Sequence, residues 1–378
     1  MKVVWRYIHA SRNTYACLYA ACEKYGWILE PAESAAEIAA ADVVCYSLNS
    51  LNFAAYADEI RDSSAITIVG GPHASACPME TARIADFVVV GEGERTLPRL
   101  LDAIRDGRAP ESIPGVATAA WVNPPDHTVY LNHFPCFGQM KGYIELSRGC
   151  PFNCGYCQTP RLHGTKMRHR SREAIVEMAH KYRDARFVTP NAFAYGSTNG
   201  RRPDVEKLGR LLSSMPENNI YFGTFPSEVR PEFVTMETAS LVSEYCANKN
   251  LHFGAQSASD DVLQRLHRGH TIADVYNALD VCRETGLMPV VDIIFGFPFE
   301  TDEDEEANLK LIRDVTRFGK MHVHYLTPLA GTPLAGVTPR AVSAKVNREL
   351  GKLALSGRVT GYWADKNFEV GYAEEKKE

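Results

Sequence analysis

Short β-rich runs alternate with helical stretches along most of this 378-residue chain. This alternation favours parallel strands joined by helices, because parallel neighbours cannot be connected by a tight turn. In the first half, strands are expected at 3–5, 42–47, 65–71 and 86–91, and helices at 14–25 and 53–61. The pattern predicts an α/β fold that begins with a doubly wound (Rossmann-like) parallel sheet, with helices on both faces, over residues 1–110.

The second half repeats the alternation with six further strand–helix units. Strands are expected at 143–146, 187–189, 220–224, 251–255, 288–294 and 322–326. Helices are expected at 172–184, 205–214, 238–248, 261–265, 272–285 and 302–318. Six such units predict a partial (β/α)6 TIM-like barrel over residues 142–335, with function at the carboxyl ends of its strands.

The segments around this second unit have a different composition. Residues 111–141 are rich in Pro and Gly and predict a linker with strands at 116–122 and 128–131. Residues 336–378 are expected to form a C-terminal helical segment, with its helix at about 345–355, and a polar tail.

Composition excludes several classes of protein. A net charge of −5 gives no electrostatic footprint for nucleic acid, and the basic clusters at 166–170 and 201–202 are expected to be solvated faces or anion-handling residues. No apolar run approaches the ~20 residues of a membrane span, and the N-terminus resembles a strand rather than a signal peptide. Ten cysteines in such a chain indicate a reducing compartment, so we expect a cytoplasmic protein without membrane or nucleic-acid partners.

Cys150, Cys154 and Cys157 form a Cys-x-x-x-Cys-x-x-Cys motif. Three thiolates this close can hold three irons of a [4Fe–4S] cluster and leave the fourth iron open to a chelating ligand. A structural zinc site needs a fourth ligand nearby, for which His163 is the nearest candidate, and a disulfide needs an oxidising compartment. The motif therefore indicates a cluster with one open iron.

Three expected strands of the first half end in small residues, namely at Ser47, at Gly70-Gly71-Pro72-His73 and at Gly91-Glu92-Gly93. The carboxyl ends of parallel strands are where open α/β sheets bind ligands, and glycine allows the backbone to approach a ligand closely. Glycine is also common in plain turns, so both interpretations remain open from the pattern alone.

The cysteine motif, with an aromatic residue before its last cysteine, resembles the cluster loop of the radical S-adenosylmethionine (SAM) superfamily. Residues 254–260, 292–301 and 328–333 resemble the SAM-binding rim of radical SAM methylthiotransferases and of cobalamin-dependent members. The ordered pair 70–74 and 91–97 resembles the cobalamin-binding domain that precedes many radical SAM domains. Together these features resemble the cobalamin-dependent (class B) radical SAM methyltransferases.

This resemblance implies a set of cofactor contacts. The methionyl amine and carboxylate of SAM would occupy the open iron of the cluster. SAM would contact Tyr156, Tyr195, Ser227, Glu228, Arg230, Gln256 and Ser257. Cobalamin would contact Ser47, Gly70, Gly71, Pro72, His73, Gly91, Glu92 and Gly93.

The sequence departs from the family pattern at three points. The Asp-x-His-x-x-Gly motif of cobalamin mutases is absent, so we expect no cobalt coordination by His73. The usual Gly-Gly-Glu is missing from residues 193–197, which follow the second strand. Gln256 stands where Glu is common, and its amide still offers an acceptor and two donors to ribose hydroxyls.

The activity implied by the resemblance is C-methylation. An electron donor such as flavodoxin or ferredoxin would reduce the cluster, SAM would yield a 5′-deoxyadenosyl radical, and the substrate carbon radical would take a methyl group from methylcobalamin. A second SAM would remethylate the cobalamin. The expected substrate is an unactivated carbon, possible targets being a protein or peptide side chain such as a residue of methyl-coenzyme M reductase.

Two alternatives stay open, and a third is less favoured. A cobalamin-binding radical SAM enzyme could catalyse rearrangement or cyclisation without methyl transfer, and a non-catalytic protein could carry the Fe–S cluster or cobalamin. A methylthiotransferase fits less well, because the first half has no cysteine trio for an auxiliary cluster and the chain has no evident basic RNA-binding module.

Overall fold

The computed structural model describes residues 1–216 and 219–363. The chain divides into two compact units. The first comprises residues 1–149 and 158–178, and the second comprises residues 150–157 and the chain from 179 onward. Both units are α/β, which confirms the predicted fold class.

The first unit is built on a six-stranded sheet with the order β2-β1-β3-β4-β5-β6. Its strands are β1 (Val3–Arg6), β2 (Glu30–Ala32), β3 (Val43–Ser47), β4 (Ile66–Gly70), β5 (Phe87–Val89) and β6 (Val116–Ala117). All neighbours are parallel except β5 and β6. The four strands expected in the first 110 residues are therefore confirmed, whereas the edge strand β2 was not predicted.

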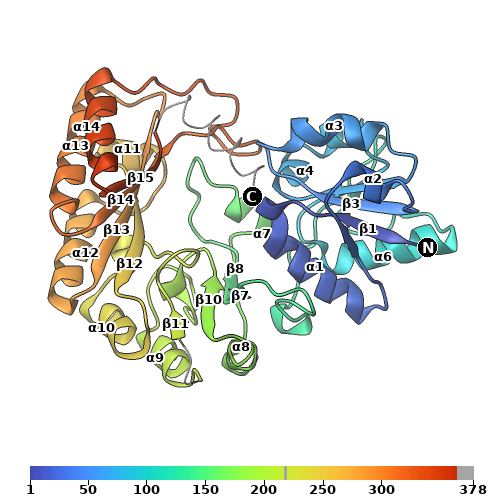
Figure 1. The fold of residues 1–378 in the computed structure, drawn as a ribbon, viewed down its shortest axis with the longest axis horizontal. Coiled ribbons are helices and arrows are strands. Elements are labelled where there is room, and N and C mark those ends of the chain that lie inside the picture. The colour runs from blue at the N-terminus through green and yellow to red at the C-terminus, as the bar shows by residue number, and fades with distance from the viewer. Residues whose placement is uncertain (217–218, 364–378) are drawn as a thin grey trace. The chain divides into compact units, whose positions relative to one another are not determined.

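Helices cover both faces of this sheet, as Figure 1 shows. They are α1 (Arg12–Lys24), α2 (Ala35–Ile38), α3 (Phe53–Arg61), α4 (Pro72–Ala76), α5 (Pro78–Thr81) and α6 (Gly93–Asp106). Successive strand residues point to opposite faces, so Trp5 packs in one core with Tyr15 of α1, while Val4 packs in another with Phe53 of α3. Two separate cores confirm a doubly wound sheet.

The rest of the first unit has little regular structure. It contains η1 (His9–Ser11), η2 (Leu131–His133), α7 (Thr159–His163) and the short strands β7 (Ile144–Glu145), β8 (Ser147–Arg148) and β9 (Arg168–His169), of which β8 and β9 pair antiparallel. The prediction of a strand at 128–131 was wrong, since the structure has no strand there. Asp126 accepts hydrogen bonds from the backbone N–H and the hydroxyl of Thr128, and this local turn replaces a ladder.

In the second unit, β10 (Asp184–Val188) pairs in parallel with β11 (Asn219–Tyr221). A four-stranded parallel sheet follows in chain order, with β12 (Asn250–Gln256), β13 (Met288–Phe295), β14 (Lys320–Tyr325) and β15 (Val359–Tyr362). The predicted strands of these five ranges are confirmed, and β15 was missed. Figure 1 shows helices along one side of this sheet, which leaves its other face for a site.

The helices in the second half of the chain are α8 (Arg172–Ala179), α9 (Val205–Ser213), α10 (Met236–Tyr245), α11 (Asp260–Arg265), α12 (Ile272–Thr285), α13 (Asp302–Val315) and α14 (Ala344–Leu355), with η3 (Ala192–Ala194) and η4 (Pro231–Phe233). Thr235, Thr271 and Thr301 cap α10, α12 and α13, so side chains satisfy the free N–H groups of the first turns. The helix at 345–355 is confirmed, and the polar tail after 363 lies outside the described residues.

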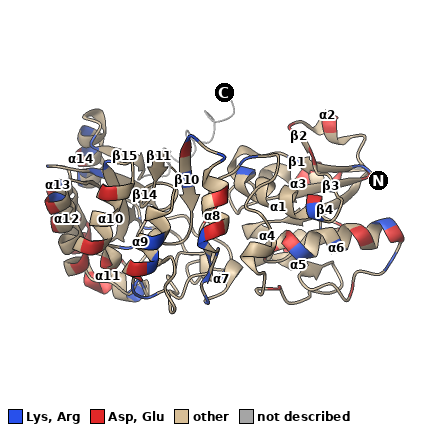
Figure 2. Cartoon of the chain, turned by 90° about the horizontal axis from the view of Figure 1, so that it is seen from below, with Lys and Arg blue, Asp and Glu red and all other residues tan. Residues whose placement is uncertain are grey.

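The expectation that the basic cluster at 166–170 is a solvated face was wrong for Arg168 and Arg170, because both are largely buried in ion pairs with Glu92 and Glu145. Figure 2 shows Lys and Arg interspersed with Asp and Glu on helices such as α8 and α9. Within the described ranges, no helix combines the length and the apolar character that a membrane crossing needs.

Candidate cofactor sites

The three motif cysteines lie on one loop of the second unit, residues 150–157. Cys154 is buried, whereas Cys150 and Cys157 are partly exposed. The backbone N–H of Gly155 donates to the carbonyl of Leu266 (2.8 Å), and the N–H of Leu334 donates to the carbonyl of Gly155 (3.3 Å). The loop is therefore anchored to the end of α11 through Leu266 and to the segment after residues 328–333 through Leu334.

Two buried arginines face the middle cysteine. The Nη1 atoms of Arg268 and Arg230 lie 3.8 and 3.9 Å from the Sγ of Cys154. Only 8% of Arg268 and 3% of Arg230 are exposed. Arg268 also donates through Nη2 to the carbonyl of Gly254 (2.8 Å), and the guanidinium of Arg230 lies 3.5 Å from the ring centroid of Phe152. Both cations are thus held in place beside the cysteine loop.

The charges around this loop do not balance without an anion. Glu232 pairs with Arg230, but the buried Nε of Arg268 has no hydrogen-bond partner. Burial and the charge of Arg268 lower the pKa of Arg230, which shows the cost of placing two cations together. A [4Fe–4S] cluster with thiolate ligands carries negative charge, so Cys150, Cys154 and Cys157 with this pair of arginines fit such a cluster.

Gln256 ends β12 in a strained conformation next to these arginines. Its φ is 69°, in the left-handed region that non-glycine residues rarely adopt, and the register of β12 shifts between Gly254 and Gln256. A Cβ on Gly254 would lie 2.0 Å from the Nε2 of Gln256, so the amide folds back over Gly254 and would have to move if that residue carried a side chain. Strain of this kind at a strand end is typical of a ligand site.

The other predicted SAM contacts lie in the second unit, and several of their side chains already have partners within the protein. The hydroxyl of Ser227 donates to the carbonyl of Thr224 and stabilises a turn, and that of Ser257 lies 3.4 Å from the Oδ1 of Asn308 on α13. Tyr195 is buried, and Tyr156 lies with its ring centroid 6.2 Å from that of Phe297.

Glu228 differs from the other predicted SAM contacts in its acidity, because burial raises the pKa of its carboxyl.

The structure brings the predicted contact Arg230 to the cysteine loop. It also brings Arg268 there, which the sequence analysis did not name as a site residue. Arg268 could have been found from the sequence because it begins the short run Arg268-Gly269-His270, which follows α11 by three residues.

In the first unit, His73 is packed into the protein. Its side chain is 9% exposed, and its ring stacks on Phe53 with centroids 3.9 Å apart. Its Nδ1 lies 3.4 Å from the Oγ of Ser50, and its Nε2 lies 3.8 Å from Glu80. Burial lowers the pKa of His73, so the imidazole is held in its neutral form.

The glycines near the carboxyl ends of β4 and β5 have internal reasons for being glycine. Gly71 has a φ of 97°, and a Cβ there would lie 2.6 Å from the carbonyl oxygen of Leu48. Gly91 has a φ of 80°, and its Cβ would lie 2.6 Å from a carbon of Pro125. A side chain is thus excluded at Gly71 and Gly91, and Ser47, Gly70 and Pro72 lie at the same edge of the sheet.

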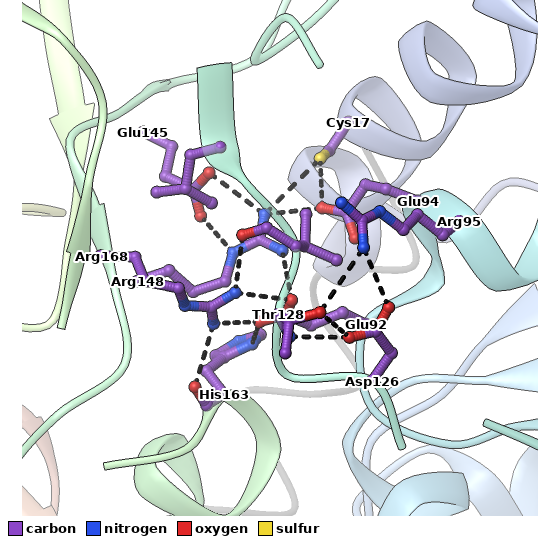
Figure 3. Close-up of polar contacts among 12 residues, drawn as sticks. Cys17, Glu92, Glu94, Arg95, Asp126, Thr128, Glu145, Arg148, His163 and Arg168 are labelled. Atoms are coloured by element: carbon purple, nitrogen blue, oxygen red, sulfur yellow. Dashed lines mark hydrogen bonds and ion pairs between the residues drawn. The ribbon is translucent and has the colours of Figure 1, made fainter. Parts of the chain in front are cut away.

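Glu92 belongs to a buried ion-pair network of the first unit, which Figure 3 shows. Arg168 donates to its carboxylate (2.9 Å), Arg148 lies 3.7 Å from it, and His163 lies 3.4 Å from it. Glu92 is 2% exposed, and Gly93 begins α6 directly after it. The structure therefore gives this carboxylate a structural role that the sequence did not predict.

The same network extends to both sequence flanks of the cysteine loop. Arg148 also pairs with Glu94 (2.6 Å) and Glu145 (2.8 Å), and Glu145 pairs with Arg170 (3.1 Å). These pairs explain why residues 142–149 and 158–178 belong to the first compact unit. The expected boundaries of the cofactor-binding domains, at about residues 110 and 142, stay a prediction, because the compact units do not define where each cofactor binds.

Two family models match the chain. The radical SAM superfamily model matches residues 144–312, and the B12-binding domain model matches residues 18–101. The chain therefore carries a match to the B12-binding domain ahead of a match to the radical SAM domain. A radical SAM domain implies a [4Fe–4S] cluster and SAM, and a B12-binding domain implies cobalamin, so these are its cofactors.

Curated relatives are similar over most of the chain. The threonylcarbamoyladenosine tRNA methylthiotransferase MtaB of Thermotoga maritima is 27% identical over 285 residues, which are 72% of this chain and 62% of the relative. A tRNA-2-methylthio-N(6)-dimethylallyladenosine synthase of Geobacter sulfurreducens is 28% identical over 67% of this chain and 60% of the relative. The chain thus spans about three fifths of the length of these relatives.

Solved structures share the fold. The radical SAM methyltransferase TsrM of Kitasatospora setae, with cobalamin and a [4Fe–4S] cluster bound, superimposes with a TM-score of 0.67 at 19% identity, over 88% of this chain and 73% of that chain. The cobalamin-dependent radical SAM enzyme OxsB superimposes with a TM-score of 0.63 at 16% identity, over 94% and 55%. These likenesses show a shared fold, and the two domain matches give this chain a B12-binding domain and a radical SAM domain.

Proposed function

We propose that this protein is a radical SAM C-methyltransferase that uses methylcobalamin to methylate an unactivated carbon. The observation that carries the proposal is the presence of a B12-binding domain and a cysteine loop with one open iron position in the same chain. The shared fold with TsrM, which is a methyltransferase, supports it. A protein or peptide side chain is the proposed class of substrate.

The protein's own contribution is binding, charge and orientation. When bound, the cluster supplies the electron that cleaves SAM, and cobalamin supplies the methyl group. Arg230 and Arg268 stabilise negative charge beside Cys154, and burial strengthens that stabilisation by excluding water. Gln256 offers its amide to a ribose from a fixed, strained backbone.

The named relatives make tRNA methylthiolation the competing function, and the first unit provides the observation that disfavours it. An auxiliary cluster in this unit would need three cysteines with free sulfur atoms. Cys22 and Cys45 are buried in the core beneath the sheet, and burial raises the pKa of each thiol. The thiol of Cys17 donates to Glu94, so it belongs to the ion-pair network.

A product balance tests the proposal. With reduced, cobalamin-loaded protein and its substrate, each methylated product should accompany one deoxyadenosine and one S-adenosylhomocysteine, because one SAM gives the radical and another gives the methyl group. With methyl-deuterated SAM, the label should enter the product after the first turnovers. Release of deoxyadenosine without S-adenosylhomocysteine would favour a rearrangement or cyclisation instead.

A further inference from the structure

The four-stranded sheet of the second unit has one apolar and one polar face. Val291 and Ile293 of β13 and Val323 of β14 are fully buried on the helix-covered face. The intervening residues point the other way, and Asp292 pairs in register with His322 on the neighbouring strand. The opposite face therefore carries titratable side chains from three adjacent strands.

On this face, one carboxylate lies among three imidazoles. The Oδ1 of Asp292 is 2.7 Å from the Nε2 of His252, 3.4 Å from the Nδ1 of His322 and 3.8 Å from the Nε2 of His324. One ligand atom from each of His252, Asp292 and His322 can be chosen so that all three lie within 4.8 Å of one another.

The burial of these groups differs in a way that matters for a ligand. Side-chain exposure is 7% for His252 and 14% for Asp292, and it rises to 32% for His322 and 43% for His324. The cluster is thus fixed at its buried end and accessible at the other. Because exposure increases from His252 to His324, an ion can enter from the exposed side while the buried ligands stay in place.

A purely structural role does not account for the arrangement. His252 is hydrogen-bonded to the Oδ1 of Asp292 at 2.7 Å, but this pair leaves unexplained why His322 and His324 also lie 3.4 and 3.8 Å from the same oxygen. The ring centroids of His322 and His324 are only 4.3 Å apart, so the two imidazoles lie side by side next to the carboxylate. A cation shared by neutral imidazoles and an ionised carboxylate satisfies all of these groups together.

We propose that His252, Asp292 and His322 bind a divalent transition-metal ion, with His324 as a further ligand or beside a position open to a substrate oxygen or nitrogen. Two imidazoles and one carboxylate are a ligand set typical of zinc and non-haem iron. This site uses no cysteine. The proposal does not depend on methyl transfer.

Zinc is the probe for the test, because it has no redox chemistry. The full chain is first reconstituted with its iron–sulfur cluster, so that iron occupies the cysteine thiolates, then incubated with Zn²⁺ under anaerobic conditions and desalted. Elemental analysis should find about one zinc per chain beyond the cluster iron. Asp292→Asn and His322→Ala should each lose that zinc, while the matched control His180→Ala, which removes an exposed imidazole elsewhere, should retain it.

Two further measurements keep the result interpretable. Zinc should raise the melting temperature of the wild type and of His180→Ala but not of His322→Ala, whose melting in metal-free buffer reports its folding. X-ray absorption at the zinc edge should show only nitrogen and oxygen ligands at about 2.0–2.2 Å. A sulfur shell, absent zinc binding in the wild type, or full zinc content in both folded variants would overturn the proposal.

Discussion

At the scale of single residues, charge beside the cysteine loop is the most informative feature. Arg230 and Arg268 lie within 4 Å of Cys154 Sγ, and Glu232 pairs directly with Arg230. The sequence predicted the cysteines from their spacing, because ligand spacing is local. It could not pair Arg268 with Cys154, since 113 residues separate them and only the fold brings them together.

We expect Arg268→Met to make the midpoint potential of the cluster more negative by tens of millivolts. The cation stabilises the reduced cluster, which carries one more negative charge, so its removal disfavours reduction. An electron paramagnetic resonance titration of the reconstituted protein measures this potential. Arg202→Met, which removes an exposed arginine, is the control, and equal potentials in the two variants would contradict the assigned role.

His73 should not coordinate cobalt. Its imidazole is stacked on Phe53 and held between Ser50 and Glu80, so these contacts would have to break before it could become a ligand. In the paramagnetic resonance spectrum of the cob(II)alamin form, we expect no nitrogen splitting from the protein, and His73→Ala should leave the spectrum unchanged. A splitting that disappears in this variant would show that His73 is an axial ligand.

At the scale of elements, the strands with a clear apolar pattern were predicted and the atypical ones were not. Val43–Ser47 and Met288–Phe295 are continuous apolar or alternating runs, and both are strands. Glu30–Ala32 has three residues and a central proline, and Val359–Tyr362 contains a glycine, so neither has a strand signature. Residues 128–131 had the composition of a strand, but Asp126 turns the chain there.

The network at the start of α6 predicts how stability depends on pH. Burial opposes ionisation of Glu92, but hydrogen bonds from Arg168 and His163 and the charge of Arg148 lower its pKa from 4.5 to about 2. A lowered folded-state pKa contributes stability that is present above pH 4.5 and is lost as the pH falls towards 2. The difference corresponds to roughly 3 kcal/mol.

Glu92→Gln should therefore destabilise the first unit by about 3 kcal/mol at pH 7, and by much less at pH 2. Urea unfolding followed by tryptophan fluorescence measures this, because three of the four tryptophans (Trp5, Trp27 and Trp121) belong to the first unit. Glu111→Gln, an exposed acid of the same unit, is the matched control. A penalty that is the same at both pH values would refute the ion-pair explanation.

At the scale of the whole molecule, the sequence predicted both cofactor modules because each is encoded by a local motif. The matches at residues 18–101 and 144–312 confirm the modules, and individual cofactor contacts stay predictions. What the sequence did not predict depends on distant residues. Arg148 binding Glu94 and the three histidines around Asp292 are examples, since their partners are set by strand order and not by spacing.

The central claim is that the transferred methyl group comes from cobalamin. The most direct measurement loads the protein with trideuteromethyl-cobalamin and follows the first and the later turnovers with unlabelled SAM by mass spectrometry of the product. The account predicts a trideuterated methyl group in the product of the first turnover and an unlabelled one in later turnovers. An unlabelled methyl group in the first product, or deoxyadenosine release with no methylated product, would contradict it.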